Sequence, residues 1–314
     1  MADGEGAQGP PTGGDDRVTP FQVADTAVRG RVVRLAGSID EILSAHAFPT
    51  GVSELVGAAA AFVAAMGASL KFDGKLILQV SGDGPLPMVL ADYSAGGALR
   101  ATAGAPKEDV SEARGLRPLV GEGHMMMTID QGPDMERYQG VTPIDGASFA
   151  DAAIGYFNQS EQIPTAARFA VGRLSRPGEP DRWRAGGIVA QFVPAEGGGR
   201  ERGEAALLSE ADLETWERAA AFVGSAQADE LIDPDLSTND LLYRLFHEDG
   251  VRVFDPTPVR AACSCNPGKI EAVLERYSAD ELAEMALEDG TIEVICEFCR
   301  TPYRFGVDGR ELKA

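Results

Sequence analysis

Hydrophobic and polar positions change their spacing several times along the first two thirds of the chain. Val alternates with Arg over 22–35, and this period of two predicts a half-exposed strand. The segment 53–66 is rich in Ala and carries larger apolar residues every three to four positions, which predicts a buried helix. Short apolar runs predict further strands at 86–91, 98–103, 125–129 and 188–193.

Turn and capping signals join these elements into one domain. Asp73-Gly74 stands between apolar runs and predicts a hairpin, because Gly accepts the positive φ that such turns require. Ser148 followed by Asp151 is typical of a capping box and predicts a helix start. We therefore expect an α+β core domain over 18–203, mostly antiparallel sheet with helices. Residues 1–17 are rich in Gly and lack apolar periodicity, which indicates a disordered tail.

The segment 204–258 differs from the core domain in its charge. Its first 46 residues contain twelve acidic and two basic residues. An aspartate three positions after a serine predicts helix starts at Ser209 and Ser237. The apolar faces of these helices include Leu213, Trp216, Phe222, Leu241, Leu245 and Phe246. Short isolated helices are marginal in water, so we expect a helical linker that is stable only while it packs on the core.

The last segment, 259–314, predicts a small separate module. Apolar residues share a helical face over 270–277, and Ser278 with Glu281 predicts the cap of a second helix. Alternation over 292–296 predicts a strand. Some fifty residues bury too little core to fold securely alone, so a structural metal would supply the missing stability.

Composition narrows the classes of partner. Hydrophobic content of 44% and charged content of 25% exclude collagen, coiled coil and wholesale disorder. With 49 acidic and 28 basic residues the net charge is −21. A surface this negative repels phosphate backbones and anionic lipid, so we expect neither nucleic acid nor membrane as a partner, although acidity can also serve solubility alone. No secretory leader and no bilayer-length apolar stretch is visible, so we expect a cytoplasmic location.

All four cysteines lie in the last 52 residues, as Cys263-x-Cys265 and Cys296-x-x-Cys299 separated by 30 residues. Two chelating thiolate pairs can close a tetrahedral site, and four soft sulfurs with no open position select one Zn²⁺ per chain. A purely structural zinc remains the alternative. Thiolates are also the oxidisable form of cysteine, and metal binding is folding energy, so loss of the metal by oxidation would unfold the module.

Together with the cysteines, several motifs give the chain its resemblance to a known family. They are Leu70-Lys-Phe-Asp-Gly-Lys-Leu76, Gln79-Val-Ser-Gly-Asp-Gly-Pro-Leu86, Tyr138-Gln-Gly140, Tyr156-Phe-Asn-Gln-Ser-Glu-Gln-Ile-Pro-Thr165, Gly186-Gly-Ile188 and Leu241-Leu-Tyr-Arg-Leu-Phe-His247. From about Val18 to Leu312 the sequence resembles the bacterial 33 kDa chaperonin family, the redox-regulated heat-shock holdases. The Gly-rich tail and the loop Gly197-Gly-Gly199 depart from the family pattern, and neither touches the cysteines.

The resemblance implies an ATP-independent chaperone and not an enzyme. In the reduced form the four cysteines bind zinc and the protein is inactive. Oxidation forms the disulfides Cys263–Cys265 and Cys296–Cys299, releases zinc and unfolds the linker. The activated family members are homodimers that hold unfolding client proteins. In this chain, packing of the apolar linker residues named above would hide client-binding surface, and loss of the zinc module would remove a support from the linker; ordinary helix packing is the alternative role for each residue.

Two other functions compete with this interpretation. A zinc module could bind nucleic acid or the ribosome, although the charge of −21 argues against it. Cys296 and Cys299 could serve a thiol–disulfide reductase, but that motif normally starts a helix in a βαβ unit, and here it follows a strand. No nucleophile motif accompanies His46, His124 or His247, so hydrolase chemistry has no support.

Overall fold

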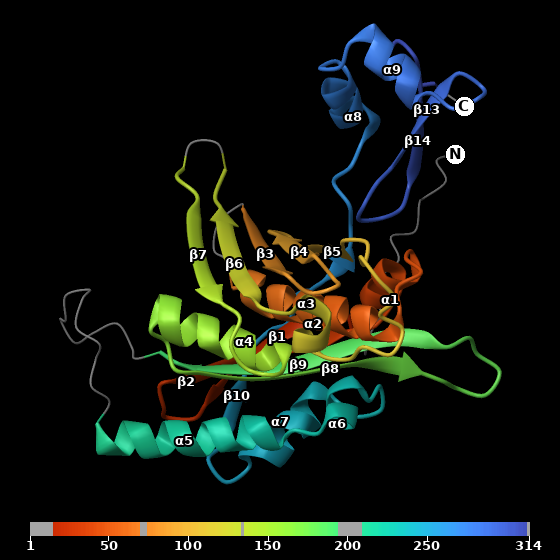
Figure 1. Ribbon diagram of the computed structural model, residues 1–314. Helices are drawn as coiled ribbons and strands as arrows, with labels where there is room; N and C mark the ends of the chain where they lie inside the picture. The colour runs from red at the N-terminus through yellow and green to blue at the C-terminus, as the bar shows by residue number, and fades with distance from the viewer. Residues whose placement is uncertain (1–14, 70–73, 133–134, 194–208, 313–314) are drawn as a thin grey trace, which may run out of the picture.

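The computed structural model describes residues 15–69, 74–132, 135–193 and 209–312 (Figure 1). Four sequence predictions fall wholly or partly outside these ranges: the tail as far as residue 14, Asp73 of the predicted hairpin, the glycine loop 197–199, and the boundary between core domain and linker at 203/204. Residues 15–17, which we expected in the tail, instead contact the core. The carboxylate of Asp16 accepts hydrogen bonds from the backbone N–H groups of Ala36 and Ser38, at 2.9 and 3.0 Å.

One six-stranded sheet, here sheet A, is antiparallel throughout. Its order is β10-β1-β2-β9-β8, and β11 also pairs with β1. The strands are β1 (Arg17–Val23), β2 (Val28–Leu35), β8 (Thr165–Leu174), β9 (Arg182–Phe192), β10 (Val251–Val253) and β11 (Thr257–Pro258). The single strand predicted over 22–35 is wrong, because the chain turns between β1 and β2. Asp25, at φ 54°, supplies the left-handed conformation there that a glycine would otherwise mark in the sequence.

The second six-stranded sheet, sheet B, has the order β12-β5-β4-β3-β6-β7. Its strands are β3 (Lys75–Gly82), β4 (Met88–Ser94), β5 (Ala98–Ala103), β6 (Gly123–Asp130), β7 (Tyr138–Pro143) and β12 (Arg260–Ala261). Among the described strands of this sheet, β12 and β5 pair in parallel and the other neighbours pair antiparallel. The C-terminal part of the chain therefore adds an edge strand to a sheet that is otherwise formed by residues 75–143.

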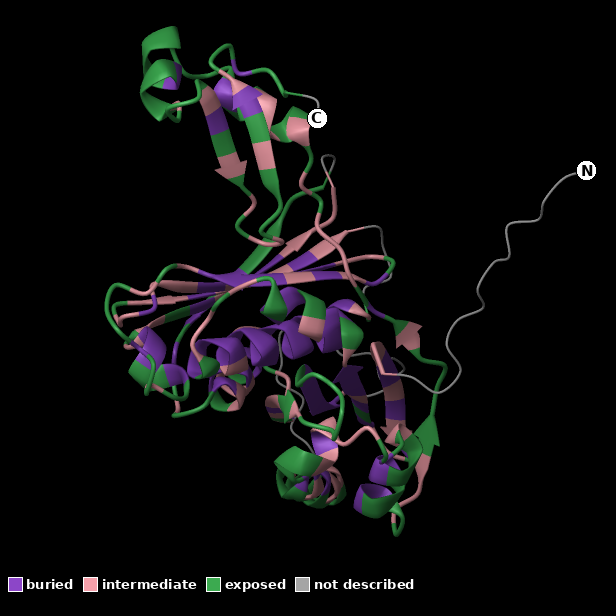
Figure 2. Cartoon of the chain, turned by 90° about the vertical axis from the view of Figure 1, so that its right-hand side faces the viewer, coloured by how far each residue is buried: buried purple, intermediate pink, exposed green. Residues whose placement is uncertain are grey.

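The helix α2 (Thr50–Gly67) lies between the two sheets, as the predicted buried helix requires (Figures 1 and 2). Its length and composition would suit a membrane span, but 89% of it is buried inside the fold. It packs with larger apolar side chains from both sheets, such as Leu78 and Val33. The other helices of this domain are α1 (Gly37–Ser44), α3 (Leu116–Val120), α4 (Phe149–Tyr156) and a π-helical turn, η1 (Phe157–Glu161). The domain is thus α+β with a mostly antiparallel core, as predicted.

The linker helices and the C-terminal module lie at opposite ends of the molecule (Figure 1). Helices α5 (Glu210–Ser225), α6 (Ala228–Ile232) and α7 (Thr238–Phe246) cover the face of sheet A that points away from α2. Helices α8 (Pro267–Leu274) and α9 (Ala279–Met285) with strands β13 (Thr291–Ile295) and β14 (Pro302–Gly306) form the module beyond sheet B. The extended segment 251–262, which pairs with β1 and then with β5, connects the two ends.

Candidate metal centre

Two turns bring the two cysteine pairs together. Cys263 and Cys265 follow β12 directly, and Cys296 and Cys299 occupy the turn between β13 and β14. Across the two pairs, Cys263 Sγ lies 3.7 Å from Cys296 Sγ, and Cys265 Sγ lies 3.4 Å from Cys299 Sγ. All four Sγ atoms lie within 4.8 Å of one another. The predicted site residues therefore meet at one point.

The sulfur positions fit a tetrahedral metal site. With a metal–sulfur distance of about 2.3 Å, four sulfurs at the corners of a tetrahedron lie about 3.8 Å apart, close to the distances here. The turn that carries Cys296 and Cys299 is closed by backbone hydrogen bonds, from Cys296 N–H to Thr301 O at 3.0 Å and from Arg300 N–H to Cys296 O at 2.9 Å. Arg300 adopts φ 58°, which lets the turn reverse within four residues. Four thiol donors in this geometry suit a soft, closed-shell metal ion.

The four sulfur groups, considered alone, do not ionise equally. Burial opposes ionisation of Cys299, but hydrogen bonds from the hydroxyl and amide of Thr301 and from neighbouring sulfurs outweigh it and lower the pKa of Cys299 to about 6. Burial, with the neighbouring thiols, raises the pKa of Cys265 to about 12. The hydroxyl of Tyr303 lies 3.1 Å from Cys265 Sγ. Of the four thiolates that a metal ion would need, the one at Cys299 therefore forms readily near neutral pH, whereas Cys265 resists deprotonation.

The module around the site has a very small apolar core. The buried apolar residues of its core in the described structure are Leu274, Leu282, Ile292 and Phe305. The cap predicted at Ser278 is present, with Glu281 completing the capping box. Four buried side chains are few for a free-standing fold, so the module depends on the metal site and on the core for its stability.

Core side chains hold the module at the turn that carries the second cysteine pair. Thr102 Oγ1 donates to the carbonyl of Glu297 at 2.7 Å, and His46 Nε2 lies 2.9 Å from the carbonyl of Phe298. The guanidinium of Arg100 lies over the Phe298 ring at 4.0 Å. Cysteine spacing could not indicate these core residues, because they lie far away in the sequence.

Arg100 also connects the sulfur cluster to a buried carboxylate. Its Nε donates to Asp92 Oδ2 at 2.6 Å, and its NH1 lies 3.9 Å from Cys263 Sγ. Asp92 is buried, and although desolvation opposes it, the attraction of Asp92 raises the pKa of Arg100. One fixed positive charge therefore lies between a core carboxylate and a cluster that becomes negative when its thiols ionise.

At the opposite end, the linker helices bury an apolar cluster against sheet A. Leu241, Phe246 and Leu245 are buried, with exposures of 0%, 0% and 9%. Trp216 and Phe222 are partly buried against the same cluster, whereas Leu213 is 44% exposed. Ser209 and Ser237 cap α5 and α7 as predicted. Five of the six predicted linker residues therefore face the core, and Leu213 faces solvent.

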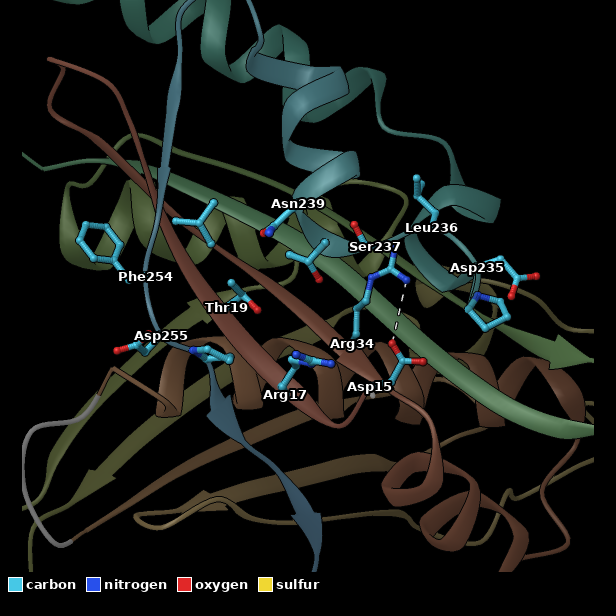
Figure 3. A pocket seen from close by; sticks show the side chains of 14 residues that line it. Asp15, Arg17, Thr19, Arg34, Asp235, Leu236, Ser237, Asn239, Phe254 and Asp255 are labelled. Atoms are coloured by element: carbon cyan, nitrogen blue, oxygen red, sulfur yellow. Dashed lines mark ion pairs between the residues drawn. The ribbon is translucent and has the colours of Figure 1, made fainter. Parts of the chain in front are cut away.

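Two buried arginines of sheet A also hold the linker. Arg34 on β2 and Arg184 on β9 are 3% and 7% exposed, and the carboxylate of Asp15 pairs with both. Figure 3 shows the pair between Asp15 and Arg34. The other acceptors of the two arginines are backbone carbonyls at the end of α6, those of Glu230 at 2.9 Å, Ile232 at 2.6 Å and Asp233 at 2.5 Å. We call Arg34, Arg184 and Asp15 the arginine clasp. Sequence reasoning missed it, because Arg34 was assigned to an alternating, half-exposed strand.

Comparison with known proteins identifies the family to which the whole chain belongs. The family model described as Hsp33 protein matches residues 16–306. The chain belongs to the Hsp33 family. It is 45% identical over 301 residues to the 33 kDa chaperonin of Caulobacter vibrioides, covering 94% of this chain and 96% of the relative. It is 35% identical over 288 residues to the 33 kDa chaperonin of Azotobacter vinelandii, and the match covers 91% of this chain and 90% of that relative.

A solved structure supports the Hsp33 fold. The crystal structure of the 33 kDa chaperonin from Thermotoga maritima superposes with a TM-score of 0.75 over 94% of this chain and 96% of that one, at 22% identity. The resemblance stated from the sequence motifs is thus confirmed, as is the α+β fold class. Family membership supports a chaperone function, and the relatives carry the name of a chaperone and not that of an enzyme.

Proposed function

We propose that this chaperone is a redox-controlled holdase that works without ATP. The observation that carries the proposal is the meeting of all four cysteine sulfurs within 4.8 Å in a module with a very small core of its own. A site of this kind links the oxidation state of the chain to the stability of a whole structural unit.

The resting form would hold one Zn²⁺ through Cys263, Cys265, Cys296 and Cys299. Zinc, when bound, supplies a charge that keeps the four sulfurs as thiolates. With hypochlorous acid as oxidant, two thiolates lose two electrons and form one disulfide, chloride and hydroxide. We assign the two disulfides to Cys263–Cys265 and Cys296–Cys299, because the two cysteines of each pair lie close together in the sequence. Each pair that forms a disulfide stops ligating the metal, and the module then loses the stabilisation that the site provided.

The linker would respond by leaving sheet A. Twelve acidic residues against two basic ones in 204–249 repel one another, and packing on the core opposes this repulsion in the resting form. Release would expose the linker side chains Trp216, Phe222, Leu241, Leu245 and Phe246 together with their partners on the sheet. Apolar burial is non-directional, so such a surface suits unfolding proteins of many sequences. Leu213 is already exposed, so it could contact a client protein before the linker leaves sheet A.

The position of the module changes one part of the expected mechanism. We expected the zinc module to support the linker, but the two lie at opposite ends of the molecule (Figure 1). The backbone connection between them is the segment 251–262, which pairs with β1 of sheet A and with β5 of sheet B. We therefore assign the coupling to this connector: unfolding of the module would release β12 from β5 and then weaken β10 and β11 on β1.

The proposal includes a cytoplasmic location and a homodimer as the active form, with unfolding proteins as clients. The alternative of a module that binds nucleic acid or ribosomes is less favoured by charge. The module 259–314 itself carries eleven acidic and seven basic residues, so it would repel phosphates as the rest of the chain does.

The test combines zinc content, thiol count and holdase activity on one sample. The reduced protein should contain one zinc and four free thiols per chain and should leave a thermally unfolding client to aggregate. Hypochlorite should release the zinc, remove all four thiols, expose amides of α5–α7 to hydrogen exchange and suppress the aggregation. If zinc and thiols are lost but aggregation proceeds as before, the holdase proposal fails.

A further inference from the structure

A second potential binding site lies between the two sheets, remote from the cysteines. A pocket of about 180 Å³ is lined by apolar side chains from the end of α2 and from sheet B. They include Met66, Leu76, Met127 and Ile129. Nothing in the proposed chaperone cycle uses this pocket.

Arg31 supplies a positive charge to the pocket wall. Among the described residues it forms no ion pair, and its NH1 donates a long hydrogen bond to Gln191 Oε1, at 3.5 Å. Burial lowers the pKa of Arg31 from its ordinary value, which reflects the cost of keeping a cation from water. The buried arginines of the clasp have Asp15 as counter-ion, but Arg31 has none among the described residues.

The surroundings of Arg31 are ordered by hydrogen bonds. Gln191 Nε2 donates to Thr165 Oγ1 at 3.3 Å, and Thr165 Oγ1 donates to the carbonyl of Ile163 at 2.9 Å. This chain of bonds orients the amide of Gln191 so that its oxygen faces Arg31. Most of the five N–H donors of the Arg31 guanidinium therefore have no acceptor among the described residues.

The segment 156–165, one of the motifs that the chaperone function does not explain, forms another wall. Here α4 widens into the π-helical turn η1, a feature frequent at functional sites. Glu161 Oε1 accepts hydrogen bonds from the hydroxyls of Tyr138 and Tyr156, at 2.8 and 3.4 Å. Burial raises the pKa of Tyr156 to about 12, so this hydroxyl remains a donor. Because Glu161 and Arg31 line one pocket without pairing, their charges occupy separate parts of its wall.

We infer that this pocket binds a small carboxylate with an apolar body, the carboxylate on Arg31 and the body among Met66, Leu76 and Met127. A guanidinium pairs with a carboxylate through two parallel hydrogen bonds, which would provide the counter-ion that Arg31 lacks. An apolar cavity of about 150 Å³ holds a benzene ring, so this pocket has room for a ring with a short acid group. The inference does not depend on the redox switch, because no cysteine or linker residue takes part.

The test uses the reduced, zinc-loaded full chain labelled with ¹³C at its methionine methyl groups. Phenylacetate is the probe, and the neutral phenylacetamide of nearly the same shape is its control. Phenylacetate should shift the signals of Met66 and Met127 but not that of Met88 on β4, and it should bind at least tenfold more tightly than the amide. Arg31→Met should weaken binding of phenylacetate at least tenfold, while Arg29→Met, at an exposed position of the same strand, should leave it unchanged.

Several results would overturn the inference. They are equal affinity for the acid and the amide, shifts at methionines outside the pocket alone, or no binding at millimolar concentration. Unchanged affinity in Arg31→Met would do so as well. If that variant does not fold, the comparison of acid and amide on the unaltered chain decides the matter. Holdase activity after hypochlorite is measured on the same samples, so failure of the pocket and failure of the chaperone proposal are separate outcomes.

Discussion

Arg100 is the residue in which three contacts between the core and the metal module meet: Asp92, the ring of Phe298 and the sulfur of Cys263. Lysine keeps the charge but lacks the planar fork, so Arg100→Lys should lose two of these contacts. Hydrogen bonds to charged groups contribute about 1.5–3 kcal/mol, so we expect zinc release by peroxide to be about tenfold faster or more. A chromogenic chelator measures the rate. Arg114→Lys, at a half-exposed core arginine, is the control, and equal rates in both variants would contradict the role of Arg100.

The arginine clasp gives a second prediction at the level of single residues. Asp15→Asn removes the shared carboxylate from Arg34 and Arg184 and leaves two buried guanidiniums without a counter-ion. Breaking a buried pair costs about 3–5 kcal/mol, and partial exposure of Asp15 reduces this to about 2 kcal/mol. Hydrogen exchange of α6 amides in the reduced protein should therefore be faster. Asp25→Asn, in an exposed turn, is the control and should leave the exchange rate of the α6 amides as in the parent chain. If these amides exchange as slowly in Asp15→Asn as in the parent chain, the clasp does not hold the linker.

At the level of elements, α7 contributes more buried apolar side chains to the linker than α5 or α6 does: Leu241, Leu242, Leu245 and Phe246. Phe246 is fully buried and its ring lies 5.6 Å from that of Phe21 and 5.9 Å from that of Phe222. Phe246→Ala should cost about 3–5 kcal/mol, most of it from docking of the linker. We expect the reduced, zinc-loaded variant to bind a hydrophobic dye and to suppress client aggregation without an oxidant. Tyr243→Ala on the same helix, where the side chain is 66% exposed, should stay inactive until oxidised. If the Phe246→Ala variant releases its linker but does not suppress client aggregation, exposure of this surface is not sufficient for holdase activity.

Local signals in the sequence predicted elements better than they predicted contacts. The caps at Ser148, Ser209, Ser237 and Ser278 are all present, because a cap depends on residues three positions apart. The cysteine cluster was predictable because thiol chemistry restricts what four paired cysteines can do. The docking of Arg100 on Cys263, 163 positions away, has no local signal. Neither has the buried state of Arg34, since an arginine in an alternating strand is typical of an exposed face.

At the scale of the whole molecule, the metal site and the linker are far apart, and the connector 251–262 is the backbone link between them (Figure 1). It is held to both sheets by backbone bonds, such as Arg260 N–H to Gly97 O at 2.8 Å and Phe254 N–H to Pro20 O at 3.0 Å. An extended segment passes a displacement along its backbone only if it has no flexible residues to absorb the displacement. Added flexible residues in the connector should therefore uncouple the metal module from the linker helices. We expect a six-residue Gly/Ser insertion between Asp255 and Pro256 to leave zinc binding and oxidative zinc release intact.

The same insertion should keep the linker docked after oxidation. Amides of α5–α7 should remain protected in hydrogen exchange, and the oxidised protein should suppress aggregation much less than the parent chain. The matched control is the same insertion at Gly178, in the turn between β8 and β9, where nothing lies within 4 Å of an added side chain. If the linker of the connector variant opens as fast as that of the control, the signal does not travel along the backbone. Loss of the metal site would then have to reach the linker through the packed core, by a route that passes α2 and sheet A.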